Sequence, residues 1–148
     1  MTDAQYVTYR ESAEDDYARE VAESGSMSWT AAVEKAAADY ARLLPRGLHS
    51  PDHHLFTAYH GDDEVGVLWL HLDSGADGLR AFVYDVHVRP ERRREGYGRA
   101  IMLAGEEFAR TQGAAWMDLN VFGQNVGARA LYEELGYETT SVQMRKRL

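Results

Sequence analysis

The chain has 148 residues, of which 45% are hydrophobic and 27% charged, with a net charge of −8 and no cysteine. This length fits one domain over residues 1–148, and the composition excludes disordered, fibrous and membrane-spanning proteins. Without cysteine there is no disulfide, no thiolate ligand for zinc and no cysteine nucleophile. We expect a cytoplasmic protein, because the acidic N-terminal stretch lacks the basic and then apolar pattern of a secretion signal.

The charge is divided unevenly along the chain. Residues 1–79 carry 15 acidic and 5 basic side chains, giving −10, whereas residues 80–148 carry 9 and 11, giving +2. An acidic half with only one local basic cluster argues against nucleic acid as a partner. Two interpretations remain: a solvated acidic surface, or an anion pocket in the second half and an electronegative mouth that attracts cations in the first.

The hydrophobic pattern predicts alternating helices and strands. In chain order it predicts a strand at 6–9, two helical stretches with the second over 29–44, strands at 53–59, 64–72 and 80–88, a helix at 96–112, a strand at 115–122, a helix at 125–135 and a strand at 139–147. Turn-forming residues separate the three middle strands, which favours an antiparallel meander. The order predicts an α/β (mixed α+β) fold, with a central, mostly antiparallel mixed sheet and helices on both faces.

The strand at 80–88 is apolar on both faces, which is typical of a central strand. Simple alternation places one set of side chains on one face: Phe82, Tyr84, Val86 and Val88. It places a second set on the opposite face: Val83, Asp85 and His87. The end of this strand should therefore lie inside the fold.

Between this strand and the next helix lies RPERRREGYGRA, residues 89–100. A helix N-terminus leaves backbone amides unpaired and carries a partial positive charge, so it stabilises an anion. The missing side chains of Gly96 and Gly98 would let that anion approach the backbone. Four arginines raise the local positive potential: Arg92, Arg93, Arg94 and Arg99. The segment is typical of a pyrophosphate-binding loop, and a solvated surface loop is the alternative.

These residues resemble a known family. The segment VRPERRREGYGRAIM resembles the acetyl-coenzyme A signature V-x-P-x-x-R-x-x-G-x-G/A of the GNAT N-acetyltransferases, at Val88, Pro90, Arg93, Gly96 and Gly98. The later segment NVGARALYEELGY is similar to the family motif N-x-x-A-x-x-L-Y-x-x-x-G-F/Y, at Asn125, Ala128, Leu131, Tyr132, Gly136 and Tyr137. The resemblance covers about residues 5–147 and is strongest over 80–138.

The resemblance implies that acetyl-CoA is the co-substrate. Strand backbone would pair with the pantetheine arm at Val86, His87 and Val88, and amides from Arg94 to Ala100 would hold the pyrophosphate. The implied binding set also includes Arg93, Arg94, Glu95, Gly96, Tyr97, Gly98, Arg99, Ala100, Asn125, Arg129 and Tyr132. By helical spacing, the last three share one stripe. The alternatives are a plain N-cap for Asn125 and a core tyrosine for Tyr132.

The implied chemistry is direct attack of a primary amine on the thioester in a ternary complex. In the family, the position of Tyr132 donates a proton to the departing thiolate, and amides near Val88 would polarise the thioester carbonyl. The amine also needs a base or a route to water, because a free lysine-like amine has a pKa of about 10.4.

The base is less well defined. Some family members carry a glutamate four residues before the position of Val88, where this chain has Tyr84. Asp85 is adjacent but expected on the opposite face, so it acts through a water or only anchors the strand. Weaker candidates are His87 and the loop residues His53 and His54.

The sequence HSPDHH lacks a recognised ligand spacing, so we expect no metal. The expected partner is a cationic amine on a small molecule or peptide, with no nucleic acid and no membrane, and a homodimer is a further family-level expectation. Two alternatives stay open: a non-catalytic module that binds or senses CoA, and an enzyme that acetylates protein N-termini or lysines.

Overall fold

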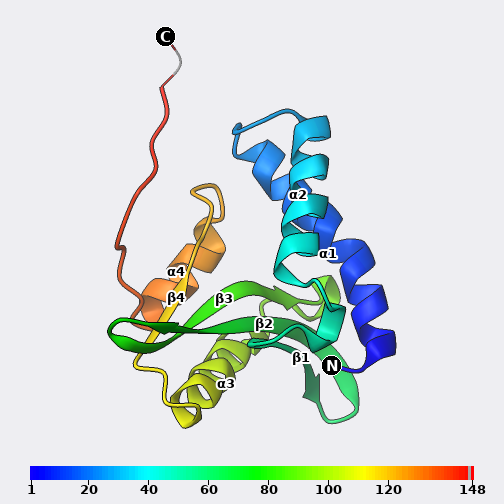
Figure 1. The fold of residues 1–148 in the computed structure, drawn as a ribbon, viewed down its shortest axis with the longest axis vertical. Coiled ribbons are helices and arrows are strands. Elements are labelled where there is room, and N and C mark those ends of the chain that lie inside the picture. The colour runs from blue at the N-terminus through cyan, green and yellow to red at the C-terminus, as the bar shows by residue number, and fades with distance from the viewer. Residues whose placement is uncertain (147) are drawn as a thin grey trace.

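Helices cover both faces of a four-stranded mixed sheet (Figure 1). The structure is a computed structural model and describes residues 1–146 and 148. The main elements are α1 (Asp3–Glu23), α2 (Trp29–Leu43), β1 (His53–His60), β2 (Asp63–Gly75), β3 (Gly78–Val88), α3 (Tyr97–Thr111), β4 (Trp116–Leu119) and α4 (Val126–Glu134). Short 3₁₀ helices span Gly47–His49 and Pro90–Arg92.

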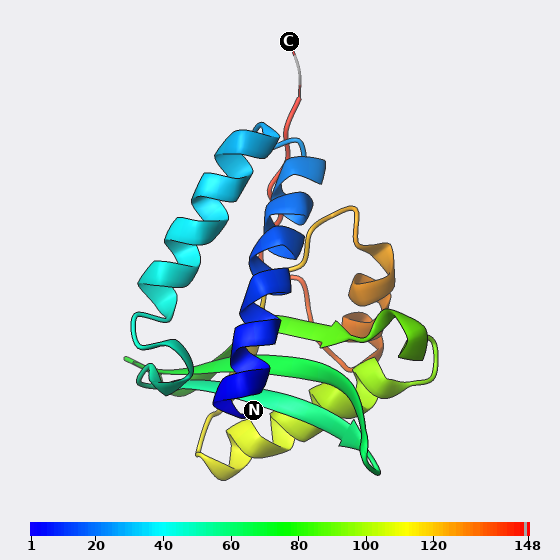
Figure 2. The ribbon, with the colours of Figure 1, turned by 90° about the vertical axis from the view of Figure 1, so that its right-hand side faces the viewer.

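The strand order is β1-β2-β3-β4. The first three strands form the predicted antiparallel meander, and β4 runs parallel to β3. The helices α1 and α2 lie against one face of the sheet and α3 lies against the other (Figure 2). The predicted mixed sheet with helices on both faces is therefore confirmed.

Two predicted strands are wrong. Residues 6–9 belong to α1. A capping box between Thr2 and Gln5 begins this helix, and its residues Tyr9 and Ala13, which lie one turn apart, are buried. Residues 139–146 form no strand, and Arg147 lies outside the described residues. A strand requires a hydrogen-bonded neighbour, and this segment has no ladder partner within the part of the chain that the structure describes.

A β-bulge interrupts β3 at Tyr84. Trp69 of β2 pairs with Asp85, but the next β2 residue, Leu70, pairs with Val83, so Tyr84 is the extra residue. The expected alternation across this strand is therefore wrong. Tyr84 stacks on Trp69 and Asp85 bonds to a residue of α1, so both side chains lie on the α1–α2 face.

The bulge also keeps apolar side chains on the α3 face. Val83 before the bulge and Val86 and Val88 after it all pack into the cluster that includes Ile101 and Met102 of α3. The inserted residue thus lets β3 pack apolar side chains into the core on the α3 face and place polar groups on the α1–α2 face.

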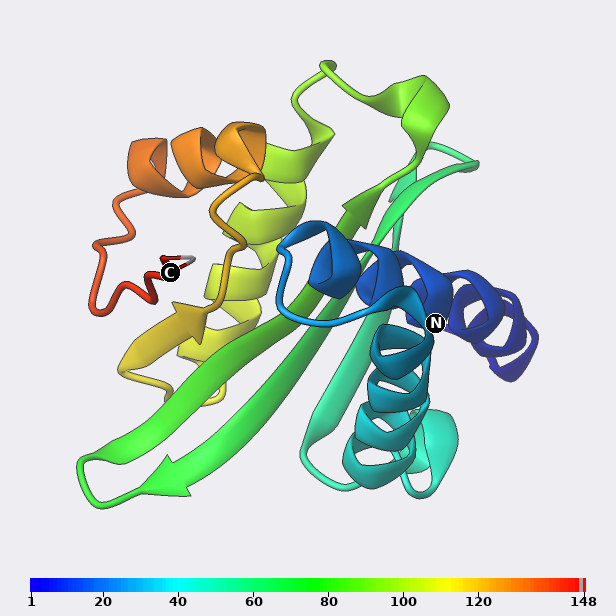
Figure 3. The ribbon, with the colours of Figure 1, turned by 90° about the horizontal axis from the view of Figure 1, so that it is seen from above.

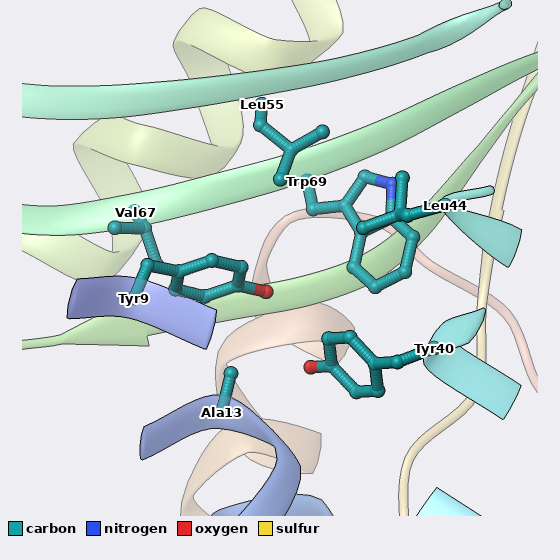
Figure 4. Packing of buried hydrophobic residues seen from close by; sticks show 7 residues of the cluster. All are labelled: Tyr9, Ala13, Tyr40, Leu44, Leu55, Val67 and Trp69. Atoms are coloured by element: carbon teal, nitrogen blue, oxygen red, sulfur yellow. The ribbon is translucent and has the colours of Figure 1, made fainter. Parts of the chain in front are cut away.

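On the other face, α1 and α2 pack on β1 and β2 through a separate cluster (Figure 4). Its buried members are Tyr9, Ala13, Tyr40, Leu44, Leu55, Val67 and Trp69. Figure 4 shows the hydroxyls of Tyr9 and Tyr40 pointing into the same space between the helices and the sheet. This cluster fixes α1 and α2 over β1 and β2.

Candidate active site

A cleft of about 1370 Å³ opens beside the C-terminal half of β3. Figure 3 shows α1 on one side of this part of β3 and α4 on the other. The cleft lining includes predicted site residues from two distant segments: Tyr84, Asp85, Val86, His87, Asn125, Arg129 and Tyr132. The structure therefore brings the central strand and the last helix together as the motifs indicated.

The strands β3 and β4 part at this cleft. Their pairing ends at Val83 and Leu119, while β3 continues to Val88. The carbonyl of Val88 accepts a hydrogen bond of 3.2 Å from Nε of Arg93, which ties the following loop to the strand end. The edge of β3 from Tyr84 onward is thus open to an extended ligand, as expected for backbone pairing with a pantetheine arm.

The loop after β3 ends in a helix N-terminus. Gly96 is the N-cap of α3 and has φ 85°, and Arg94 has φ 65°, so both lie in the left-handed region that turns the chain into the helix. The first helical amides, at Tyr97, Gly98 and Arg99, have no acceptor within the helix. The Ala100 amide differs, because it donates to the Gly96 carbonyl at 3.1 Å.

The loop arginines have different roles. Arg92 is held by Tyr97 at 2.6 Å, Asp63 at 3.2 Å and Glu95 at 3.3 Å, so it braces the loop. Arg94 and Arg99 are exposed, and neither forms an ion pair within the described residues. The positive charge offered to a ligand therefore comes from these two side chains and from Arg93, which is also exposed and forms no ion pair within the described residues.

Gly98 has a packing role that the sequence did not indicate. A Cβ built there would lie 3.3 Å from Cδ2 of Leu131 and 3.7 Å from a methyl of Val88. The missing side chain thus makes room for α4 against the start of α3. A Cβ at Gly96 would meet nothing within 4 Å, so that glycine is required by its backbone conformation alone.

Asp85 is the central polar group of the cleft. Its Oδ2 accepts a hydrogen bond of 2.8 Å from the hydroxyl of the buried Tyr9. Burial raises the pKa of Asp85 to about 6, against a smaller lowering by the Tyr9 hydrogen bond. Sequence reasoning missed Tyr9 because it assigned this segment to a strand; its spacing of four from Ala13 is the helical signal that could have found it.

The α1 wall of the cleft is acidic. Asp16 and Glu20 line it, and both add to the rise in the pKa of Asp85. Burial, followed by the neighbouring charges of Asp16 and Glu23, raises the pKa of Glu20 as well. These carboxylates lie where an electronegative mouth, one of the two interpretations of the charge division, would be.

Tyr132 reaches the same cleft from α4. It is 9% exposed, and its ring lies 5.9 Å from that of Tyr137. Burial, with a contribution from the Asp85 charge, raises the pKa of Tyr132 to about 12. The phenol therefore stays protonated and can donate a hydrogen bond throughout the neutral range.

The other two cleft residues of α4 make local contacts. Asn125 is the N-cap, and its side chain accepts from the Ala128 amide at 3.2 Å, so it caps the helix, and the residue also lines the cleft. Arg129 donates to Glu133 at 3.0 Å on the rim.

Tyr84 lies in an aromatic stack. Its ring is 4.8 Å from those of both Trp69 and Phe82, and all three residues line the cleft. Burial raises the pKa of Tyr84, so its hydroxyl stays protonated at neutral pH and the phenolate that could accept a proton is scarce. The stack provides an apolar floor beside Asp85.

Of the three histidine candidates, His87 lines the cleft, whereas His53 and His54 lie outside it. His53 and His54 begin β1 and do not lie in a loop, and Nδ1 of His53 accepts from the Trp69 indole at 2.9 Å. Burial lowers the pKa of His53 to about 4 and also lowers that of His87. Among the described residues, no group of three or more His, Asp or Glu side chains is placed to hold a metal ion.

None of the helices that the structure describes combines the length and the apolar character needed to cross a membrane.

Comparisons with known proteins agree with this geometry. The family model of the acetyltransferase (GNAT) family matches residues 9–137. The N-acetyltransferase YycN of Bacillus subtilis (strain 168) is 38% identical over 110 residues, which cover 74% of this chain and 70% of YycN. The N-acetyltransferase YdgE of the same organism is 30% identical over 149 residues, covering 100% of this chain and 95% of YdgE.

Similarity extends to solved structures. The crystal structure of YycN matches with a TM-score of 0.95 and 33% identity, covering 100% of this chain and 95% of that one. A mycothiol acetyltransferase of Thermobispora bispora is 38% identical over 92 residues, but the match covers only 31% of that longer protein. The fold, the cleft and these relatives together show an acetyltransferase, and the chain belongs to the GNAT family.

Proposed function

We propose that this acetyltransferase moves the acetyl group of acetyl-CoA to a primary amine of a cationic small molecule or peptide, by direct attack in a ternary complex. The observation that carries the proposal is the bulge at Tyr84, which turns Asp85 into the cleft that Tyr132 lines from α4. A group that can accept a proton and a group that donates a hydrogen bond thus share one cleft.

The residues present fit acetyl-CoA. The N-terminus of α3, with free amides from Tyr97 to Arg99 and the exposed Arg94 and Arg99, offers donors and charge to a pyrophosphate. The open edge of β3 from Val86 to Val88 offers backbone groups to an amide-containing arm. When bound there, acetyl-CoA supplies the activated thioester.

Asp85 is the proposed proton acceptor for the attacking amine, directly or through a water. With a pKa of about 6, Asp85 is ionised at neutral pH. This pKa is nevertheless closer to the working pH than that of an ordinary carboxylate, which favours proton transfer. Its position beside Asp16 and Glu20 places it where a protonated amine would be drawn in.

Tyr132 is the proposed hydrogen-bond donor to the leaving sulfur. Because the pKa of its phenol is raised to about 12, a tyrosinate is costly, and the hydroxyl serves mainly to stabilise the thiolate until it takes up the proton that Asp85 removed from the amine, or one from water. The aromatic floor of Trp69, Phe82 and Tyr84 would hold the non-reacting part of the acceptor.

The first experiment is a calorimetric titration with acetyl-CoA of the wild type, Arg99→Gln and Arg110→Gln. Arg110 lies at the far end of α3 and pairs with Glu107, so it is a matched control. We expect saturable binding that Arg99→Gln weakens about tenfold and Arg110→Gln leaves unchanged, since a charged hydrogen bond is worth about 1.5 kcal/mol or more. Equal loss in both variants, or no binding to folded wild type, would contradict the proposal.

The acceptor class is then tested by thiol release in a panel of amines. Small cationic amines, neutral amines, and peptides with free N-termini or lysines separate the small-molecule enzyme from a protein N-terminal or lysine acetyltransferase. Faster release with cationic than with neutral amines of the same size supports the proposed acceptor, and the reverse order rules it out.

A further inference from the structure

The start of β2 is tied to the loop after β3 at three successive residues. The amide of Arg89 donates to the Val65 carbonyl at 2.9 Å, and the Arg89 guanidinium pairs with Glu64 at 2.8 Å. The guanidinium of Arg92 donates to Asp63 at 3.2 Å. Figure 3 shows this loop beside the β1–β2 turn. The proposed pyrophosphate loop is therefore anchored to a strand end that is distant from it in the sequence.

Arg92 also reaches the first residue of α3. Its Nη2 donates to the Tyr97 hydroxyl at 2.6 Å, and its guanidinium carbon lies 5.1 Å from the centre of the Tyr97 ring. Because the hydroxyl accepts from Arg92, its own hydrogen is available to Nδ1 of His60 in β1, which it also contacts. Asp63, Arg92 and Tyr97, here called the brace, thus connect the start of β2 to the start of α3.

The loop that the brace spans contains an unfavourable backbone conformation. Arg94 has φ 65°, a left-handed conformation that residues with a Cβ rarely adopt. Such a conformation persists only where the surrounding structure fixes it. The Arg94 side chain is exposed and forms no ion pair within the described residues, so it does not fix its own backbone. The brace holds the chain on both sides of Arg94 and can therefore maintain this turn.

The donors of Arg92 are directed at the protein. Besides its bonds to Tyr97 and Asp63, the guanidinium pairs with Glu95 at 3.3 Å, and the side chain is only 26% exposed. An arginine beside an anion site would ordinarily be assigned to binding the anion. These contacts indicate a different role, in which Arg92 shapes the loop and leaves the ligand to other groups.

We propose that Arg92 and the hydroxyl of Tyr97 are positioning residues for acetyl-CoA, and that Asp63 of β2 anchors them. These side chains keep the loop in the shape in which the amides from Tyr97 to Arg99 face the pyrophosphate. A loop that already has its bound shape loses less conformational freedom on binding, so the brace raises affinity. The inference rests on the proposed binding of acetyl-CoA at the N-terminus of α3.

The sign of one substitution tests the anchor. Removing an acidic side chain near an anion site ordinarily strengthens binding of the anion, whereas the brace predicts weaker binding of acetyl-CoA by Asp63→Asn. We expect a loss of only about two- to fivefold by calorimetry, because the Asp63 side chain is 75% exposed. Asp62→Asn is the matched control, since its neighbouring carboxylate is exposed and forms no ion pair within the described residues. Asp62→Asn should bind as tightly as wild type or slightly more tightly.

Tyr97→Phe tests the hydroxyl and keeps both the ring and the backbone amide. We expect acetyl-CoA to bind about tenfold more weakly, because the lost bond has a charged donor. Tyr59→Phe is the control: its hydroxyl lies on β1 and contacts Gln5 of α1, away from the loop. Unchanged or tighter binding in Tyr97→Phe and Asp63→Asn would overturn the inference, because the contacts would then only withhold Arg92 from the ligand.

Arg92→Lys separates the brace from simple charge. Lysine keeps the positive charge but lacks the planar fork that serves Tyr97 and Asp63 together. We expect Arg92→Lys to bind acetyl-CoA as weakly as Arg92→Gln, with KM for acetyl-CoA raised and with kcat at saturation and thermal unfolding of the free protein nearly unchanged. Full affinity in Arg92→Lys would assign this residue to charge alone, and a parallel drop in kcat and thermal stability would assign it to packing; either result overturns the inference.

The same titrations distinguish this inference from the proposed function. If the folded wild type does not bind acetyl-CoA, both fail. If the wild type binds and the brace variants bind equally well, only the positioning role fails.

Discussion

The hydroxyl of Tyr9 bonds to the carboxylate of Asp85 at 2.8 Å, across 76 positions of the chain. This contact joins the first helix to the bulged centre of β3, and it stabilises the charged form of Asp85 in a place where burial favours the neutral form. The docking of α1 and the protonation of the proposed base are therefore linked.

Replacing Tyr9 by phenylalanine should move the acidic limb of the pH profile of kcat/KM upward by about one pH unit. The reason is that a hydrogen bond to a charged acceptor is worth about 1.5 kcal/mol or more, and its loss raises the pKa of Asp85. Tyr6→Phe is the control, because Tyr6 also belongs to α1 and packs against the same cluster, but it does not line the cleft and has no recorded bond to Asp85. Lower activity with an unmoved limb would mean that Tyr9 only supports packing.

Glu20→Gln should move the acidic limb of the pH profile of kcat/KM to lower pH. Removing a negative neighbour lowers the pKa of Asp85, and it should also raise KM for a cationic acceptor several-fold. Glu11 of α1 is exposed and does not line the cleft, so Glu11→Gln should leave both quantities unchanged. If Glu20→Gln and Glu11→Gln gave the same pH profile and the same KM, the acidic side chains of α1 would have no part in binding the acceptor.

Asp85→Asn should lower kcat by about 10²- to 10⁴-fold and yet stabilise the protein at neutral pH. The folded pKa, about 6, lies above an ordinary aspartate value, so the contribution of Asp85 to the stability of the wild type is greatest in acid and is lost as pH rises through about 6. The asparagine of Asp85→Asn carries no charge at any pH, so the variant avoids this loss of unfolding free energy, which amounts to at most about 3 kcal/mol.

Urea unfolding of Asp85→Asn and wild type across pH 4 to 8 should therefore show a stability gap that opens as pH rises and levels off above about 6. A constant gap would show that Asp85 is not buried as an unfavourable charge.

Tyr132→Phe should reduce kcat by about 100-fold and leave acetyl-CoA binding nearly unchanged, because the phenol is proposed to act on the leaving sulfur. Rapid-quench measurement of one turnover would separate chemistry from product release. Tyr137→Phe is the comparison, since that ring packs on Tyr132 and also lines the cleft. Full turnover in Tyr132→Phe would assign this residue to packing alone.

Gly66→Ala should destabilise the fold by about 1–3 kcal/mol or more, as expected for overpacking. A Cβ at Gly66 would lie 2.3 Å from the His87 carbonyl oxygen and 2.9 Å from Ile101, so β2 and β3 would have to separate. Gly123→Ala meets nothing within 4 Å and should be neutral in thermal unfolding. Equal melting temperatures for the two variants would contradict this packing.

The sequence predicted the meander, α3, α4 and the cleft-lining stripe of Asn125, Arg129 and Tyr132, because these elements follow regular hydrophobic periods or a family motif. It did not predict that Tyr84 and Asp85 share a face. A bulge depends on the pairing partner, and no local pattern in this strand marks it.

The first helix shows a second kind of limit. Its residues 6–9 read as a strand because tyrosine, valine and threonine favour β structure, and the tertiary contacts of Tyr9 and Ala13 with the sheet override that preference. The α1 wall of the cleft is therefore the part of the candidate site that sequence reasoning could not place.

The bulge at Tyr84 makes β3 tolerant of a shorter chain at one position. Without Tyr84, Val83 and Asp85 would be consecutive residues on opposite faces, so Val83, Val86 and Val88 would keep the α3 face and Asp85 would keep the α1–α2 face. A codon deletion at Tyr84 would therefore remove one aromatic ring from the cleft and leave the apolar core of the α3 face in register.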